Sequence, residues 1–136
     1  METKPILIAI LFIVIVVLIS GIMSVFENNT PPGEKLVIND LNIAPTQYGH
    51  YKLVGHVTPK KDMDYIEARV EYFSNSGVMV DKNSPAWNIR DVKANQELGI
   101  ERIVSFSGSP DYAVVSFYDD VGGKGLLGTW NITFQK

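Results

Sequence analysis

The adjacent carboxylates Asp119 and Asp120 are the strongest candidates for chemistry in this sequence, because three of the next five residues are glycines. Paired carboxylates in such a loop can offer several oxygens to a hard cation such as Ca²⁺. A tight turn between two strands needs the same residue types for conformational reasons. The loop lacks the spaced acidic positions of an EF-hand, so we expect a turn, with Asp119 and Asp120 as metal-ligand candidates. Asp62 and Asp64 form a weaker pair of this kind.

Motifs for catalysis are missing from the sequence. No serine lies in a G-x-S-x-G or S-x-x-K pattern, and no glycine-rich phosphate loop occurs. His50 and His56 would lie about 20 Å apart along one strand, and no cysteine exists to complete a zinc site. We therefore expect a protein that is not an enzyme and needs no cofactor.

One aromatic residue suggests an interface instead. Trp87 follows Ser84, Pro85 and Ala86 in a loop-like context, and aromatic residues in loops are typical anchors of protein–protein contacts. Trp87 is therefore an interface candidate. The alternative is that its ring folds back over an open end of the domain.

The elements that would position these residues begin with an apolar segment. Residues 6–26 contain no charge, and about 20 apolar residues suffice to cross a bilayer. We expect residues 1–27 to form a membrane anchor helix, with the lipid bilayer as partner of residues 6–26, and residues 28–34 to form a linker. Lys4 precedes the apolar run and no Lys or Arg follows it before Lys35, which favours a cytoplasmic N-terminus. The sequence predicts a single-pass protein of the cell membrane whose domain lies outside the cytoplasm.

Residues 35–136 have the length of one domain. Charges are interspersed and the net charge of the chain is −3, so the basic stripe needed for nucleic-acid binding is missing. The absence of cysteine means that an apolar core alone must stabilise the domain, as in many domains of prokaryotic envelopes.

Period-two alternation of apolar and polar residues dominates this domain and predicts strands. Met63, Ile66 and Val70 also fit helical spacing, but the β-branched and aromatic content of Asp62 to Phe73 favours a strand. At the C-terminal end we place Trp130 in the core, on one face with Leu126, Gly128, Ile132 and Phe134. The expected strands are Leu36–Ile43, Tyr48–Val57, Tyr65–Phe73, Val78–Lys82, Gln96–Phe106, Tyr112–Tyr118 and Leu126–Phe134. Seven strands in this length predict an all-β, antiparallel, immunoglobulin-like sandwich, preceded by one N-terminal transmembrane helix.

Three segments carry a resemblance to a known family. Tyr51 to Val57 contains a Gly-x-Val step, Val70 to Val80 passes through a turn, and Val92 to Glu97 is a loop of small and polar residues. In this order they resemble the FxLYD-type domains of uncharacterised membrane-anchored proteins of archaea and bacteria. The resemblance implies an immunoglobulin-like sandwich and brings no catalytic residue.

Three functions are compatible with this organisation. The first is a membrane-anchored, extracytoplasmic β-sandwich with a binding or structural role in the cell envelope, with an envelope protein as partner. The second is a pilin- or archaellin-like filament subunit, although Met1 to Pro5 lacks the glycine-containing processing site of those precursors. The third is a cation-dependent envelope enzyme, which would need a clustered polar pocket.

The anchor gives a first testable prediction. The full-length chain should stay in the membrane pellet after a carbonate or high-salt wash, because the hydrophobic effect holds residues 6–26 in lipid and salt does not weaken it. Immunoblotting of pellet and wash measures this. Release of the full-length chain into the wash would contradict it.

Overall fold

The computed structural model describes residues 35–135, which form seven strands and no helix. No helix within these residues has the length and apolarity to cross a membrane. The anchor predicted over residues 6–26 and the linker over 28–34 lie outside the described residues. The strands are β1 (Leu36–Pro45), β2 (Tyr51–Pro59), β3 (Met63–Phe73), β4 (Met79–Val92), β5 (Leu98–Val104), β6 (Tyr112–Tyr118) and β7 (Leu126–Thr133).

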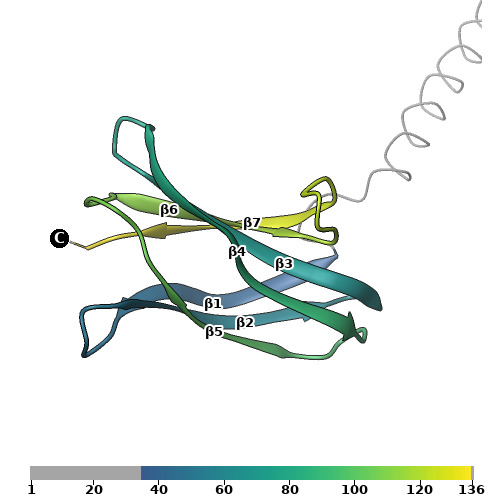
Figure 1. Cartoon of the computed structure of the whole chain (residues 1–136). Helices are drawn as coiled ribbons and strands as arrows, with labels where there is room; N and C mark the ends of the chain where they lie inside the picture. Colours follow the sequence, from purple (N-terminus) through teal and green to yellow (C-terminus); the bar gives the residue numbers. More distant parts are fainter. Residues whose placement is uncertain (1–34, 136) are drawn as a thin grey trace, which may run out of the picture. The chain divides into compact units, whose positions relative to one another are not determined.

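The strands form two antiparallel sheets that face each other (Figure 1). One sheet has the order β1-β2-β5, and the other has the order β4-β3-β6-β7. The chain changes sheet after β2, after β4 and after β5. The prediction of an all-β fold with two antiparallel sheets and seven strands is confirmed.

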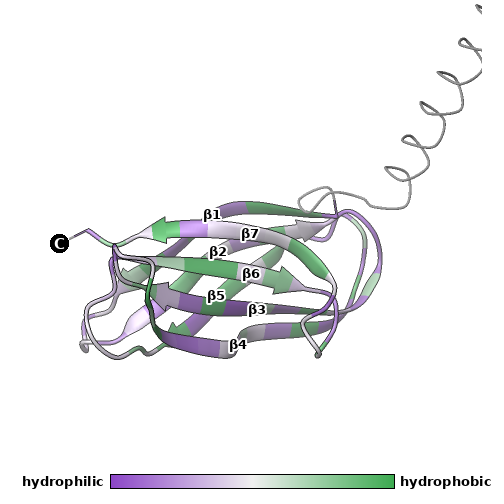
Figure 2. Cartoon of the chain, turned by 90° about the horizontal axis from the view of Figure 1, so that it is seen from above, coloured by the Kyte–Doolittle hydropathy of each residue, from purple (hydrophilic) through white to green (hydrophobic). Residues whose placement is uncertain are grey.

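Strand β3 shows how the sequence pattern builds the core. Its residues Ile66, Ala68, Val70 and Tyr72 are fully buried and point to the other sheet, because alternate side chains of a strand share one face. The predicted strand is thus confirmed over Met63–Phe73, and the helical alternative is wrong. Hydrophobic and hydrophilic residues alternate along the strands in the same way (Figure 2).

A β-bulge changes the face that β1 presents to the core. The register with β2 shifts between Asn39 and Asn42, and Asp40 has a φ of 53°. Because the bulge adds one residue, Leu36 faces inward before it and Leu41 after it. A Cβ at Gly55 would lie 2.7 Å from the Leu41 Cα atom, so the close approach of these strands requires glycine.

A second bulge corrects the expected face of β7. The register with β6 shifts between Phe117 and Tyr118, so Leu127 is buried and Leu126 is exposed. The prediction that Leu126 faces the core is therefore wrong. Beyond the bulge the predicted parity holds, and Ile132 is buried. Trp130 packs against the core but is only partly buried, because its strand lies at the edge of the sheet.

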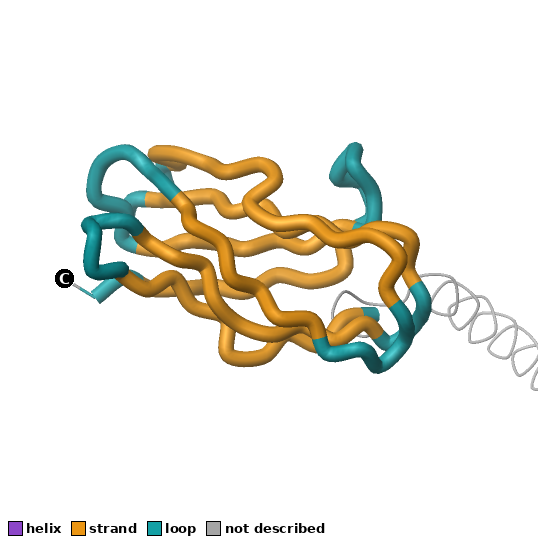
Figure 3. Tube along the Cα trace, turned by 60° about the horizontal axis from the view of Figure 1, so that its bottom comes forward, coloured by secondary structure: helices purple, strands orange, loops and turns teal. Residues whose placement is uncertain are grey.

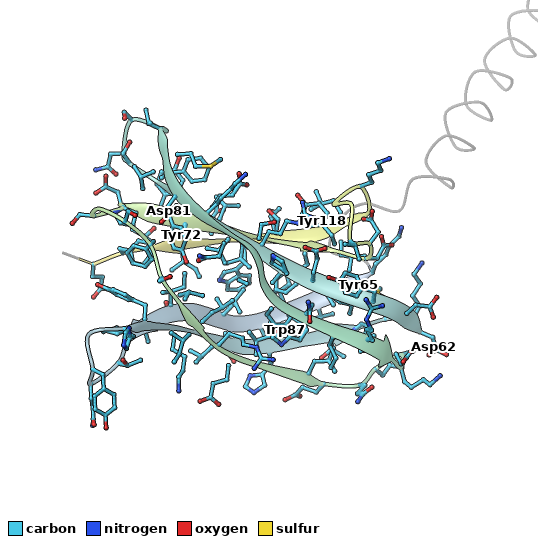
Figure 4. The ribbon with its side chains drawn as sticks, in the orientation of Figure 1. Asp62, Tyr65, Tyr72, Asp81, Trp87 and Tyr118 are labelled. Carbon is cyan, nitrogen blue, oxygen red and sulfur yellow. The ribbon has the colours of Figure 1, made fainter. Side chains whose placement is uncertain are left out.

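Strand β4 corrects the interpretation of Trp87. The strand extends to Val92 instead of ending at Lys82, since residues 84–86 form an irregularity between two paired segments. Trp87 therefore pairs with Ala68 within the sheet, and its ring meets Phe117 edge-on at 6.5 Å. With only 6% of its surface exposed, Trp87 is a core residue between the two layers (Figure 4) and not an exposed interface anchor.

The relative burial of the two tryptophans gives a second prediction. In the fragment of residues 34–136, which we expect to fold with a β-type circular dichroism spectrum, Trp87→Ala should lose ~3–5 kcal/mol of unfolding free energy. Trp130→Ala should lose less, because part of its ring is already in solvent. Urea denaturation midpoints of the two variants and the parent measure this. A lower midpoint for Trp130→Ala than for Trp87→Ala would contradict the assigned core.

Candidate functional site

The loop of Asp119 and Asp120 is closed by its own hydrogen bonds. The Asp120 Oδ1 atom accepts the backbone N–H groups of Lys124 and Gly125 at 2.8 and 2.9 Å. The Asp119 N–H donates to the Gly125 carbonyl at 2.9 Å, and a Cβ at Gly125 would collide with the Asp119 carboxylate. These contacts give both aspartates a role in shaping the turn.

The guanidinium group of Arg69 lies next to this loop. Arg69 donates to the Val121 carbonyl at 2.8 Å and lies 4.9 Å from the centre of the Tyr118 ring. Hydrogen bonds from the backbone, first that of Gly125, lower the pKa of Asp120, and the charge of Arg69 lowers it further. Within residues 35–135 no group of three His, Cys, Asp or Glu side chains could hold a metal ion.

The other sequence candidates are dispersed over the surface. His50 lies in the β1–β2 loop, and His56 lies on β2 at 3.9 Å from the Glu97 carboxylate. Asp62 accepts the Ala94 backbone N–H at 2.9 Å, so it fastens the β4–β5 turn. The structure brings none of these residues together with Asp119 and Asp120.

One buried carboxylate lies on the outer face of the four-stranded sheet. Glu67 is only 1% exposed, and it accepts hydrogen bonds from Arg69 Nε at 2.8 Å and from the Tyr65 hydroxyl at 3.3 Å. A buried charge of this kind must be paired to be tolerated. Since its partners are part of the same strand β3, the cluster serves the fold.

A groove of about 580 Å³ lies at one end of the sandwich. It opens where β1 and β7 end, next to the β5–β6 loop, and none of its lining side chains is charged. The lining combines aromatic rings with amide and hydroxyl groups. Its residues are Asn42, Ile43, Ala44, Pro45, Tyr51, Phe106, Gly108, Ser109, Pro110, Thr133, Phe134 and Gln135.

An aromatic cluster forms the inner wall of this groove. The Phe106 ring is central, since its centre lies 4.5 Å from that of Tyr72, 4.7 Å from Tyr51 and 5.5 Å from Phe134. Tyr72 is fully buried, whereas the other three rings are partly exposed. Aromatic pairs at these distances add about 0.5–1.5 kcal/mol to the effect of burial, so the wall is rigid and apolar.

Two polar side chains of β4 hold Phe106 in place. Asn83 accepts the Tyr72 hydroxyl at 2.6 Å and donates to the Ser105 carbonyl at 2.9 Å. Asp81 accepts the Ser107 backbone N–H at 2.8 Å. Burial, and secondarily the charge of Asp81, raises the pKa of Tyr72, so this hydroxyl remains a donor. Figure 4 shows Tyr72 and Asp81 at the groove end and Asp62 at the opposite end.

The two ends of the sandwich differ sharply in charge. Loops gather at both ends of the strands (Figure 3). At the groove end, the three loops of residues 46–50, 74–78 and 105–111 contain one acidic residue, Asp111, which accepts the Asn75 backbone N–H at 2.7 Å, and no Lys or Arg. The three turns at the other end hold eight charged residues: Lys60, Lys61, Asp62, Lys93, Glu97, Asp119, Asp120 and Lys124.

The groove end also carries exposed apolar side chains. Tyr48 is 85% exposed at the tip of the β1–β2 loop, and Val78, Met79 and Val80 are exposed at the start of β4. A surface with few charges and several exposed apolar groups is suited to contact with another molecule. Sequence reasoning missed this site, because Tyr51, Phe106 and Phe134 come from separate segments that only the topology brings together.

No protein-family model and no curated protein matches the chain. Among solved structures, the beta-glucosidase DesR from Streptomyces venezuelae, in complex with D-glucose, is similar with a TM-score of 0.40 and 10% sequence identity. The match covers 74% of this chain and 15% of DesR.

The hydrogen bond from the Ser107 backbone N–H to Asp81, beside the groove wall, gives a third prediction. Hydrogen bonds from the backbone N–H groups of Ser107 and Lys82 lower the pKa of Asp81. The ionised carboxylate therefore stabilises the fold above the ordinary pKa near 3.9, and this stabilisation is lost as the pH falls through the lowered value. Asp81→Asn should reduce the melting temperature at pH 7, and the difference from the parent should shrink below about pH 3.9.

The matched control for this prediction is Asp64→Asn, an exposed carboxylate at the other end of the sandwich. It should change the melting temperature little at either pH. A pH-independent loss of stability in Asp81→Asn would contradict the role of the ionised carboxylate. Differential scanning calorimetry of the fragment of residues 34–136 gives both measurements.

Proposed function

We propose that this chain is a membrane-anchored, extracytoplasmic binding module that recognises an envelope protein through the groove end of its sandwich and performs no catalysis. The observation that carries the proposal is the uneven distribution of charge between the loops of the two ends, together with the aromatic groove whose lining has no charged side chain. A partner with an apolar or neutral surface can dock there without removing paired charges from water.

The connectivity of the chain supports this orientation of the site. The chain enters the sandwich at Leu36, at the charged end, and β1 runs ten residues to Pro45 at the groove. At about 3.3 Å per residue, the groove lies roughly 30 Å along the strand from that entry point. If residues 6–26 anchor the chain and residues 28–34 link it, the site is at the end remote from the linker attachment.

The strand order supports an immunoglobulin-like assignment. β1, β2 and β5 correspond to strands A, B and E, while β3, β6 and β7 correspond to C, F and G, with β4 joined to the second sheet.

Site-specific photo-crosslinking in native membranes tests the proposal as a fourth prediction. A benzophenone amino acid in place of Tyr48, at the groove end, should give an adduct with a second envelope protein. The same amino acid in place of Lys61, at the charged end, should give none. Mass spectrometry of the adduct identifies the partner.

A charge placed in the groove should separate specific docking from random contact. Asn42→Lys introduces a cation into the uncharged lining and should abolish the Tyr48 adduct. Asn39→Lys, also exposed and on the same strand but outside the groove, should leave it intact. Equal adducts from positions 48 and 61, or an adduct insensitive to Asn42→Lys, would refute the proposed site.

A further inference from the structure

Strand β7 is an edge strand whose residues beyond the bulge at its start, 129–133, carry no device against pairing. It lies at the margin of the four-stranded sheet (Figure 2), and within residues 35–135 only β6 forms a ladder with it. Residues 126–133 contain no charged residue and no proline. An edge of this composition is a template for another strand, which proteins normally avoid.

The other three edges carry such protection. β1 has a bulge at Asp40 and ends in Pro45. β5 presents Glu101 and Arg102 in its middle. β4 contains Pro85 together with several charged residues, which are Asp81, Lys82, Arg90 and Asp91. β7 has a bulge only at its start, so residues 129–133 leave an open edge without a charge or a proline.

The hydrogen-bonding groups of β7 define how a strand would add. The Phe134 N–H donates to the Asp111 carbonyl at 3.0 Å, so the even-numbered residues of β7 face β6. By the alternation of an antiparallel ladder, Thr129, Asn131 and Thr133 direct their N–H and C=O groups to the open side. Their side chains are exposed on the outer face of the sheet.

We propose that β7 pairs antiparallel with β7 of a second copy of this chain, with Asn131 on the two-fold axis. This register makes Thr129 face Thr133 of the second copy and joins all three open residues of each strand in hydrogen-bonded pairs. On the inner face, the partly exposed Trp130 meets Ile132 of the second copy. The result is one continuous eight-stranded sheet across the dimer.

The composition of β7 selects a second copy as the occupant. Two-fold pairing sets identical strands against each other, so any charge in the strand would face a like charge nearby. β7 has none, and its outer face pairs Thr with Thr and Asn with Asn, which are favourable cross-strand neighbours. Pairing also covers the exposed part of Trp130. The pairing does not require a ligand in the groove. The two surfaces share one residue, Thr133.

Cysteine crosslinking of the full-length chain in membranes tests this, because the chain has no cysteine of its own. Opposite residues of a hydrogen-bonded pair have Cα atoms ~5.5 Å apart, within reach of a disulfide. After oxidation with copper phenanthroline, Asn131→Cys should give a dimer on a non-reducing gel. Lys82→Cys, exposed on the β4 edge, should give none.

The register has its own control. Thr129→Cys alone should not crosslink, because the two copies of this residue would lie ~13 Å apart along the strands. Coexpression of Thr129→Cys with Thr133→Cys should give the dimer, and adding Asn131→Lys to both should abolish it by placing two cations on the axis. Asn39→Lys in the same background should leave the dimer intact.

Two results would overturn the proposal. One is an Asn131→Cys chain that dimerises no more than Lys82→Cys. The other is a Thr129→Cys chain that crosslinks with itself as well as with Thr133→Cys. Unchanged circular dichroism of the Asn131→Lys domain, compared with the parent domain, shows that lost dimer reflects lost pairing, because this side chain is exposed. Asn42→Lys, which targets the groove, should not affect the crosslink, so the two proposals can fail separately.

Discussion

The contact between the inner faces of the two sheets carries this fold. Within residues 35–135 no backbone ladder joins β1-β2-β5 to β4-β3-β6-β7, and the sequence contains no cysteine for a disulfide. The sheets are therefore held by the burial of side chains such as Leu53, Tyr72 and Phe117, each worth roughly 1.5–3 kcal/mol when fully removed from water. The groove depends on the same packing, because Tyr72 of one sheet forms part of the wall that Phe106 and Tyr51 complete.

The sequence predicted the strands well wherever alternation was regular. From Ile66 to Tyr72 every second residue is apolar, so the inward face of β3 followed from the pattern, while its β-branched and aromatic content favoured a strand over a helix. The prediction was wrong where one strand contains an extra residue. The bulge at the start of β7 exchanged the roles of Leu126 and Leu127, and nothing in an alternating apolar pattern reveals a bulge that depends on the partner strand. In β4, Pro85 suggested a loop, but the irregularity at residues 84–86 accommodates it and the strand continues to Val92.

The candidate site was less accessible from the sequence than the fold. Adjacent carboxylates such as Asp119 and Asp120 are typical cation ligands, yet Asp120 accepts the backbone N–H groups of its own loop. Trp87 looked exposed because its neighbours are typical of loops. The residues that form the groove have no spacing in common, since Asn42, Phe106 and Phe134 meet only through the crossing of the chain between sheets. The charge difference between the two ends could have been read from the sequence, but only with the order of the strands in hand.

The side-chain amide of Asn83 acts both as a hydrogen-bond acceptor and as a donor. The oxygen accepts the Tyr72 hydroxyl and the nitrogen donates to the Ser105 carbonyl. Spontaneous deamidation would convert this amide to a carboxylate. One of its oxygens would then face the Ser105 carbonyl, which is also an acceptor, and its negative charge would add to that of Asp81 near Tyr72. The segment that carries Phe106 would then lose its donor on β4. Deamidation of Asn83 alone would thus loosen the wall of the groove while the strands of the sandwich stay in place.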